Sequence, residues 1–222
     1  HADAIKRGYV EIPPWMPTGA SPVKFMFNRN AFEADRVLAV YCVHVDTEDI
    51  HLLKKNNVSV CITPRANAHL GMGVAPLSEI LSNELTVGLG SDSPASTNST
   101  DLFSEMRIGM LVQRSVDPKS FISPEKMLYL ATLGGASALG LADKIGSLEV
   151  GKHADMVAVD FSEITAAAFD PIAAMVNNCY ASDVMMTMVD GVVRYEKNKW
   201  HVDVEVAKNV ARIIEIKRKL RA

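Results

Sequence analysis

The sequence predicts an α/β protein that has a parallel sheet and, after it, a smaller β layer. Between residues 37 and about 115, short apolar segments alternate with amphipathic ones across short connections. This alternation is typical of a doubly wound fold or a (β/α)8 barrel. After residue 150, two apolar segments are joined by a tight turn, which is typical of antiparallel strands. The 222 residues are 48% hydrophobic and 22% charged, an ordinary globular composition.

Three strands are predicted in the first half, each followed by a helix. The first strand, over 37–45, is a near-continuous apolar run, as expected of a strand buried on both faces. Capping residues at 46–49 then begin a helix that ends near Lys55. The remaining segments are a strand over 58–63, a polar loop, a helix over 76–81, a strand over 85–90, a second polar loop over 91–100 and a helix over 102–111.

The second half begins with a helix and continues with hairpin strands. Ser123-Pro124 begins a helix over 126–133, which Gly134-Gly135 is expected to break. Asp190-Gly191 is a strong hairpin turn between strands at 184–189 and 192–195. The other predicted elements are a helical turn over 136–141, a strand over 156–160, a helix over 171–175 and a terminal helix within 202–220 that docks through its apolar residues.

Charge and cysteine content exclude several classes of protein. A net charge of −3 gives no electrostatic reason to expect nucleic acid or an anionic membrane as a partner. The apolar runs are too short to span a bilayer, and three cysteines in apolar settings indicate reduced thiols in the cytoplasm. Because the first residue is His1 rather than Met, we expect sequence to be missing upstream.

Candidate site residues follow the predicted parallel strands, where active residues of such sheets gather. His44 ends the first strand, Arg65 and Asn67 follow the second, and Asp92 follows the third. His1 is placed to close a truncated strand at the amino terminus. A carboxylate at such a position is suited to act as a metal ligand or a general base.

Each candidate also has a structural interpretation. A single histidine at a strand end is more often hydrogen-bonded within the fold than a ligand, and this applies to His44. Asp92 is equally suited to cap the following turn. Arg65 and Asn67 are suited to satisfy backbone groups of their own loop.

Several motifs, in the same order, resemble the carboxy-terminal half of the amidohydrolase superfamily. The similar branch contains chlorohydrolases, methylthioadenosine/S-adenosylhomocysteine deaminases and aminofutalosine deaminases. The matching stretches are Gly19-Ala-Ser-Pro-Val23, Leu38-Ala-Val-Tyr-Cys-Val-His44, Pro64-Arg-Ala-Asn67, Val87-Gly-Leu-Gly-Ser-Asp-Ser93, Asp101-Leu-Phe-Ser-Glu-Met-Arg107, Ala131-Thr-Leu-Gly-Gly-Ala-Ser-Ala-Leu-Gly140, Ile145-Gly-Ser-Leu-Glu-Val-Gly-Lys-His-Ala-Asp155 and Met188-Val-Asp-Gly191.

The resemblance implies a fold and its division along the chain. The fold is a partial (β/α)8 TIM-type barrel, containing about the last four to five β/α units, plus part of a small β-sandwich. Residues 1–145 are expected to form the carboxy-terminal part of the hydrolase barrel, 146–200 part of the composite β-sandwich, and 201–222 the terminal helix. Three clear strands and one truncated strand cannot close an eight-stranded barrel, so the chain is expected to need a further segment or partner.

The resemblance also implies chemistry. A divalent metal, zinc or iron, activates water to attack an amidine or aryl carbon, and a carboxylate ligand passes the proton to the leaving amine. Asp92 matches the metal-binding aspartate, and His44 matches a position that contacts the substrate and moves protons. His1 matches a substrate-contacting histidine. Arg65, with Asn67, resembles the Pro-Arg-Ser-Asn of aminofutalosine deaminases and is suited to bind a substrate carboxylate.

The chain departs from the family pattern at its metal histidines. The His-x-His pair of the first barrel strand has no counterpart, the next metal histidine position holds Tyr41, and another histidine position holds Ile62. One carboxylate cannot hold zinc, which needs at least three protein ligands, so this chain alone is not expected to bind the metal.

Two functions are therefore predicted. The first is a hydrolytic deaminase of a purine nucleoside or related amidine, of which this chain is a fragment lacking the amino-terminal metal ligands. The alternative is a metal-free, catalytically silent subunit or scaffold. The expected partners are a small-molecule substrate and the missing amino-terminal half, a partner chain or a second copy.

Overall fold

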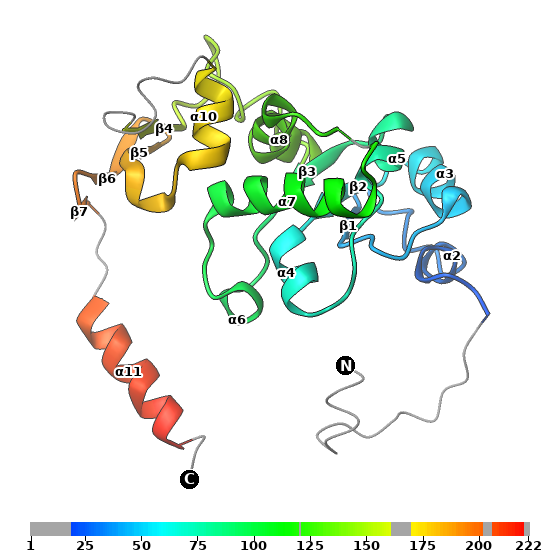
Figure 1. The fold of residues 1–222 in the computed structure, drawn as a ribbon, viewed down its shortest axis with the longest axis horizontal. Helices are drawn as coiled ribbons and strands as arrows, with labels where there is room; N and C mark the ends of the chain where they lie inside the picture. The colour runs from blue at the N-terminus through cyan, green and yellow to red at the C-terminus, as the bar shows by residue number, and fades with distance from the viewer. Residues whose placement is uncertain (1–18, 120, 161–169, 202–205, 220–222) are drawn as a thin grey trace.

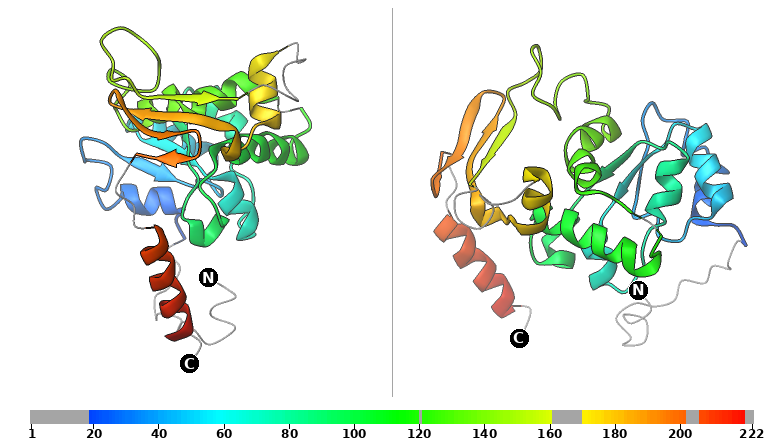
Figure 2. Two further views of the ribbon diagram at one scale, coloured as in Figure 1. Left: turned by 90° about the vertical axis from the view of Figure 1, so that its left-hand side faces the viewer. Right: turned by 45° about the horizontal axis from the view of Figure 1, so that its top comes forward.

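A computed structural model describes residues 19–119, 121–160, 170–201 and 206–219. Two separate sheets organise these residues, a parallel sheet of three strands and an antiparallel sheet of four. Helices lie around the parallel sheet, and the antiparallel sheet lies at the other end of the molecule (Figure 1; Figure 2, right). The described helices include none long and apolar enough to cross a bilayer.

The parallel sheet has the strand order β1-β2-β3, which is also the order along the chain. β1 (Leu38–Val40), β2 (Ser59–Ile62) and β3 (Val87–Leu89) pair in parallel, with Ala39 opposite Val60 and Cys61 opposite Gly88. The predicted alternation of strand and helix is thus confirmed for three units. Within the described residues the sheet is open rather than a closed barrel, and the strand predicted at His1 lies outside those residues.

The core lies between this sheet and the helices that connect its strands. Val60, Ile62 and Val87 of the strands are at most 3% exposed and pack with fully buried side chains of the helices. The helices that follow the three strands are α3 (Thr47–Lys55), α4 (Pro64–His69), α5 (Leu77–Ser82), α6 (Pro94–Thr97) and α7 (Leu102–Val116), preceded by α2 (Pro22–Phe27). Asp46 caps α3 in a capping box with Asp49, as the sequence predicted.

The first strand differs from its prediction. The apolar run over 37–45 was expected to be a strand buried on both faces, but β1 has three residues, and Leu38 and Val40 are 37% and 45% exposed. The strand ends because Tyr41 and Cys42 take left-handed backbone angles, with φ of 73° and 46°. Among the described strands β1 has only β2 as a neighbour, so one edge and part of its side-chain surface are uncovered.

Two predictions about loops and breaks were wrong. The polar stretch after β2 was expected to be a loop, but Pro64 begins the helix α4, because a proline fits the first helical position. The helix predicted over 126–133 ends earlier, as α8 (Pro124–Ala131), and Gly135 lies inside α9 (Leu133–Ala138). Gly134 of the same helix serves packing, since a Cβ on it would lie 2.7 Å from the Val87 carbonyl oxygen of β3.

The antiparallel sheet confirms the predicted hairpin. Its strands are β4 (Met156–Val159), β5 (Val184–Val189), β6 (Val192–Glu196) and β7 (Lys199–Trp200), preceded by the helix α10 (Pro171–Asn178) and the turn η1 (Ala181–Asp183). Asp190 and Gly191 have φ of 51° and 75°, as a tight hairpin turn requires. Val157, Tyr195 and Trp200 share one face of this sheet by strand register, and Val157 and Trp200 are 55% and 63% exposed.

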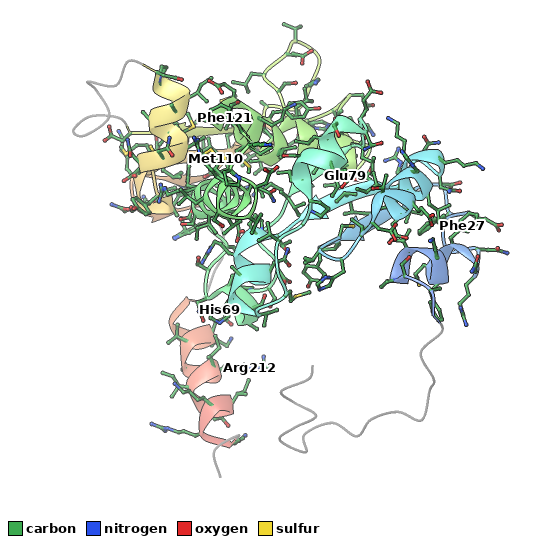
Figure 3. The ribbon with its side chains drawn as sticks, turned by 45° about the vertical axis from the view of Figure 1, so that its right-hand side comes forward. Phe27, His69, Glu79, Met110, Phe121 and Arg212 are labelled. Atoms are coloured by element: carbon green, nitrogen blue, oxygen red, sulfur yellow. The ribbon has the colours of Figure 1, made fainter. Side chains whose placement is uncertain are left out.

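The terminal helix forms but does not dock on the described residues. α11 (Val206–Lys219) projects away from both sheets (Figure 1), and Figure 3 labels Arg212 on this helix. Its apolar residues Val210, Ile213 and Ile216 are 49% to 63% exposed, so the prediction that this helix docks is wrong for the described chain.

Candidate functional site

The carboxyl ends of the three parallel strands bring Tyr41, the start of α4 and Asp92 to one edge of the sheet. Tyr41 follows β1 and still donates its backbone N–H to the Cys61 carbonyl at 3.0 Å. Asp92 lies two residues beyond Gly90, whose N–H donates to the Ile62 carbonyl at 2.9 Å. The sheet therefore extends its hydrogen bonding up to the candidate residues and fixes where their loops begin.

Asp92 accepts three hydrogen bonds. The Tyr41 hydroxyl and the Ser96 hydroxyl each donate to Oδ2 at 3.0 Å, and the Ser93 N–H donates to Oδ1 at 2.6 Å. These bonds lower the pKa of Asp92, the Ser93 bond most and the Tyr41 bond least. They favour the ionised carboxylate, which is the form required of a metal ligand or a general base.

Tyr41 is the partner that links two different loops. Its bond to Asp92 is the main reason that the pKa of Tyr41 is raised, with burial adding to the effect. The phenol therefore keeps its proton and acts as a donor to the carboxylate. A protonated phenol is a poor metal ligand, so the residue at the family's metal histidine position is here used as a hydrogen-bond donor.

Of the two predicted histidines, only His44 belongs to the residues that the structure describes. His44 is exposed, in the loop after β1, and its ring lies beside Gly73, where a Cβ would be 4.0 Å from the His44 Cε1. His44 and Asp92 share no hydrogen bond, although both belong to the described residues. His1 lies outside the described residues.

Arg65 is placed at the edge of the sheet but directs its guanidinium inward. Nη2 donates to the Thr97 carbonyl at 2.7 Å, and Nη1 lies 3.6 Å from Oε1 of Glu105. The Arg65 backbone N–H also donates to Glu105 Oε2 at 3.1 Å. At 3.6 Å the charges attract without a hydrogen bond, so both Nη1 and Oε1 remain buried and unsatisfied within the described part of the chain. The predicted contact with a substrate carboxylate stays a prediction.

Sequence reasoning did not single out Glu105. It is fully buried on α7, and burial raises its pKa to about 7, although the Arg65 N–H and guanidinium favour the charged form. The clue in the sequence is a glutamate at a position of α7 that faces the sheet, one turn beyond the capping residue Asp101. Ser96 was missed for a simpler reason, because a serine four residues after an aspartate is common in loops.

Asn67 is buried, and the two nearby cysteines are partly buried. The Asn67 side chain accepts from the Thr63 hydroxyl at 3.4 Å and lines a cavity of about 20 Å³ beneath α4. Burial raises the pKa of Cys61, and it raises that of Cys42 to about 11. Both thiols therefore keep their protons at neutral pH, which makes them weak ligands and weak nucleophiles.

A second, larger hollow lies elsewhere on the surface. It has a volume of about 230 Å³ and is lined by the second half of α7, the segment after it and α10. Met110 and Phe121, both on its wall, lie together in Figure 3. Because its lining includes none of Tyr41, Arg65 and Asp92, this hollow is not part of the candidate site.

The donor set at this edge does not fit a zinc or iron ion. Asp92 is the single carboxylate here that the resemblance assigns to a metal, and Ile62, at another histidine position, is 2% exposed within the apolar core. No group of three or more His, Cys, Asp or Glu side chains in the described ranges is placed to hold a metal. Zinc requires three or four such ligands.

The fold and this edge define an α/β protein whose candidate residues follow the strands of a parallel sheet. Residues 20–194 match the model of the amidohydrolase family, and the chain belongs to that family. It is 39% identical to an S-triazine hydrolase of Gordonia rubripertincta over 161 residues, which is 72% of this chain and 34% of that protein. It is 32% identical to a 5-methylthioadenosine/S-adenosylhomocysteine deaminase of Acetivibrio thermocellus, over 87% of this chain and 47% of the relative.

Solved structures give the same result. A zinc-bound adenosine deaminase of Xanthomonas campestris superposes with a TM-score of 0.84 at 28% identity, over 99% of this chain and 48% of that one. A zinc complex of atrazine chlorohydrolase from Arthrobacter aurescens gives 0.79 at 26% identity, over 88% and 43%. The chain thus spans between about a third and a half of the relatives it matches.

Proposed function

We propose that this chain is the carboxy-terminal part of an amidohydrolase that hydrolyses a carbon–nitrogen bond, as a deaminase of a purine nucleoside or a related amidine. The observation that carries the proposal is the ionised Asp92 carboxylate, held by three hydrogen bonds at the carboxyl edge of a parallel sheet. The similar proteins include deaminases and a triazine hydrolase, which supports hydrolysis as the class of reaction.

The proposed roles follow the sequence. Asp92 and His44 are the proposed catalytic residues, as groups that accept and move protons, and Arg65, Asn67, His44 and His1 are the proposed substrate contacts. The proposed division into barrel (1–145), composite sandwich (146–200) and terminal helix (201–222) belongs to the same proposal. The uncovered edge of β1 supports completion of the barrel by a segment outside these residues.

No catalytic step through a metal is assigned to this chain, because the described donors are too few to hold one. In the proposed complete enzyme the additional ligands come from the completing segment. A cation there would lower the pKa of a bound water and so supply hydroxide at neutral pH.

The experiment expresses the chain together with the coding sequence that precedes it in its gene. Ammonia release is measured from adenosine, 5′-methylthioadenosine, S-adenosylhomocysteine and an amino-s-triazine, with zinc or iron supplied. We expect release from at least one of these, loss of release in Asp92→Asn, and no change in Glu125→Gln, an exposed carboxylate on α8. Absence of release from every compound, in a folded and metal-supplied protein, refutes the proposal.

The Tyr41–Asp92 bond favours a second candidate, a metal-free and catalytically silent subunit. A hydroxyl group occupies a carboxylate oxygen here, and the described residues lack a three-donor group. Metal content of the purified 222-residue chain, measured after incubation with zinc or iron, tests this candidate. Stoichiometric metal contradicts it, whereas no metal together with no ammonia release from the completed protein supports it.

A further inference from the structure

Three residues other than glycine have left-handed backbone angles where the loops after β1 and β3 begin. They are Tyr41 with φ of 73°, Cys42 with 46° and Asp92 with 57°. Such angles are uncommon for residues with a side chain, and tyrosine is not among the types that tolerate them well. Strained positions of this kind persist when surrounding contacts hold them, and they gather at functional sites.

A hydrogen bond between the side chains joins two of these residues, Tyr41 and Asp92. β1 and β3 are not neighbours, because β2 lies between them. With neighbouring strands roughly 4.8 Å apart, the Tyr41 side chain has to cross the end of β2 to reach Asp92. The left-handed turn directly after Val40 places the phenol for that crossing, and its hydroxyl lies 3.0 Å from Asp92 Oδ2.

The chain leaves room for this crossing at the end of β2. Cys61, opposite Val40 and Gly88 in the sheet, presents a compact side chain there. Its Sγ lies against Gly90, where a Cβ would be only 2.8 Å away. Because Gly90 and Cys61 are small, they leave room between the two loops for the phenol of Tyr41 to cross.

The bond also determines which part of the carboxylate is available. A carboxylate has two oxygens and about four acceptor positions. Tyr41 and Ser96 occupy Oδ2, and the Ser93 N–H occupies one position on Oδ1. The remaining position is on Oδ1, so a proton, a substrate group or a cation meets Asp92 at that oxygen.

We propose that Tyr41 is the positioning residue of this site: its hydroxyl crosses β2, fixes the orientation of Asp92 and leaves Oδ1 as the oxygen that acts. The proposal rests on the proposed function for its catalytic consequence. The fixing of Asp92 is a property of the 222-residue chain itself. Hydrogen bonds to a charged group are stronger than those between neutral groups, and weaker where water reaches them, as it does at this half-buried position.

The first test is a double-mutant cycle in the 222-residue chain, with Tyr41→Phe, Asp92→Asn and both together. Tyr129→Phe is the matched control, since it removes a phenol hydroxyl from an exposed ring on α8. We expect Tyr41→Phe to lower the folding equilibrium constant roughly fivefold to tenfold in the wild-type chain, and to lower it much less once Asp92 is Asn. Additive effects, or an effect of Tyr41→Phe no larger than that of Tyr129→Phe, overturn the proposal.

A direct readout does not depend on stability. In tyrosine-labelled protein, the 13Cζ resonance of Tyr41 is expected to shift when Asp92 is replaced by Asn, while that of Tyr129 stays in place. An unchanged Tyr41 resonance means that the bond is absent and overturns the proposal.

Activity separates this inference from the proposed function. In the completed protein we expect Tyr41→Phe to lower kcat at least tenfold with little change in KM, and Tyr129→Phe to change neither. A rise in KM as large as the fall in kcat, or no fall in kcat, overturns the positioning role. If the completed protein releases no ammonia while the cycle and the resonance show the bond, the proposed function fails and the fixing of Asp92 by Tyr41 stands.

Discussion

Replacing Glu105 by Gln is expected to change how stability depends on pH. Glu105 is fully buried, and burial raises its pKa from an ordinary 4.5 to about 7. Because the folded state then binds a proton that the unfolded state has lost, stability falls as pH rises between these two values. The contribution is fully present below pH 4.5 and is lost above about 7.

The magnitude follows from the two pKa values. Each pKa unit corresponds to about 1.4 kcal/mol, so the shift amounts to about 3 kcal/mol of unfolding free energy across this pH range. Glutamine keeps an oxygen that accepts from the Arg65 N–H and cannot ionise. Relative to the wild type, the Glu105→Gln chain should therefore gain about 3 kcal/mol between pH 4.5 and pH 8.

The difference in unfolding free energy between Glu105→Gln and the wild type is measured by urea unfolding, followed by circular dichroism at half-unit steps from pH 4.5 to pH 8. All other titrating groups are common to both proteins and cancel in the difference between them. A difference that stays constant with pH shows that Glu105 ionises at its ordinary pKa despite its burial. A difference that moves in favour of the wild type at high pH shows that the Arg65 pairing outweighs burial, which reverses the sign argued above.

Three further changes test the packing. Asp46→Ala removes the acceptor of the Asp49 N–H at 2.8 Å and should cost about 1 kcal/mol of unfolding free energy in urea; an unchanged midpoint contradicts the capping box. Gly90→Ala places a Cβ 2.8 Å from Cys61 Sγ and should cost about 1 to 3 kcal/mol, of which Cys61→Ala in the same chain recovers a large part. Leu53→Ala, at a fully buried position of α3, should cost about 2 to 5 kcal/mol, and a cost below 1 kcal/mol argues against a packed core there.

Local patterns in the sequence predicted the elements whose causes are local. The α3 helix carries its own capping residues, and Asp190-Gly191 specifies its own turn, so both were predicted correctly. The length and burial of β1 were predicted wrongly, because burial of a strand depends on the elements that pack beside it and not on its own residues. The same holds for α11, whose apolar spacing indicates a surface to be covered but not which surface covers it.

The candidate site was predictable as a place and less so as a set of contacts. Parallel strands bring their carboxyl ends together, so Asp92 and the residues after β1 could be expected near one another. The inward direction of Arg65 could not, because it depends on Glu105, forty residues further along the chain. The Tyr41 bond also depends on two left-handed residues, which the residue types at 41 and 42 do not suggest.

Hydrogen bonds to Asp92 hold the loop after β3. Its left-handed residue is an aspartate, a type that takes this conformation at lower cost than most because a short polar side chain bonds locally. Asp92 does so by accepting from the Ser93 N–H. The Ser96 hydroxyl, four residues further on, and the Tyr41 hydroxyl, from another loop, also donate to its carboxylate. The orientation of Asp92 is therefore built into this part of the chain.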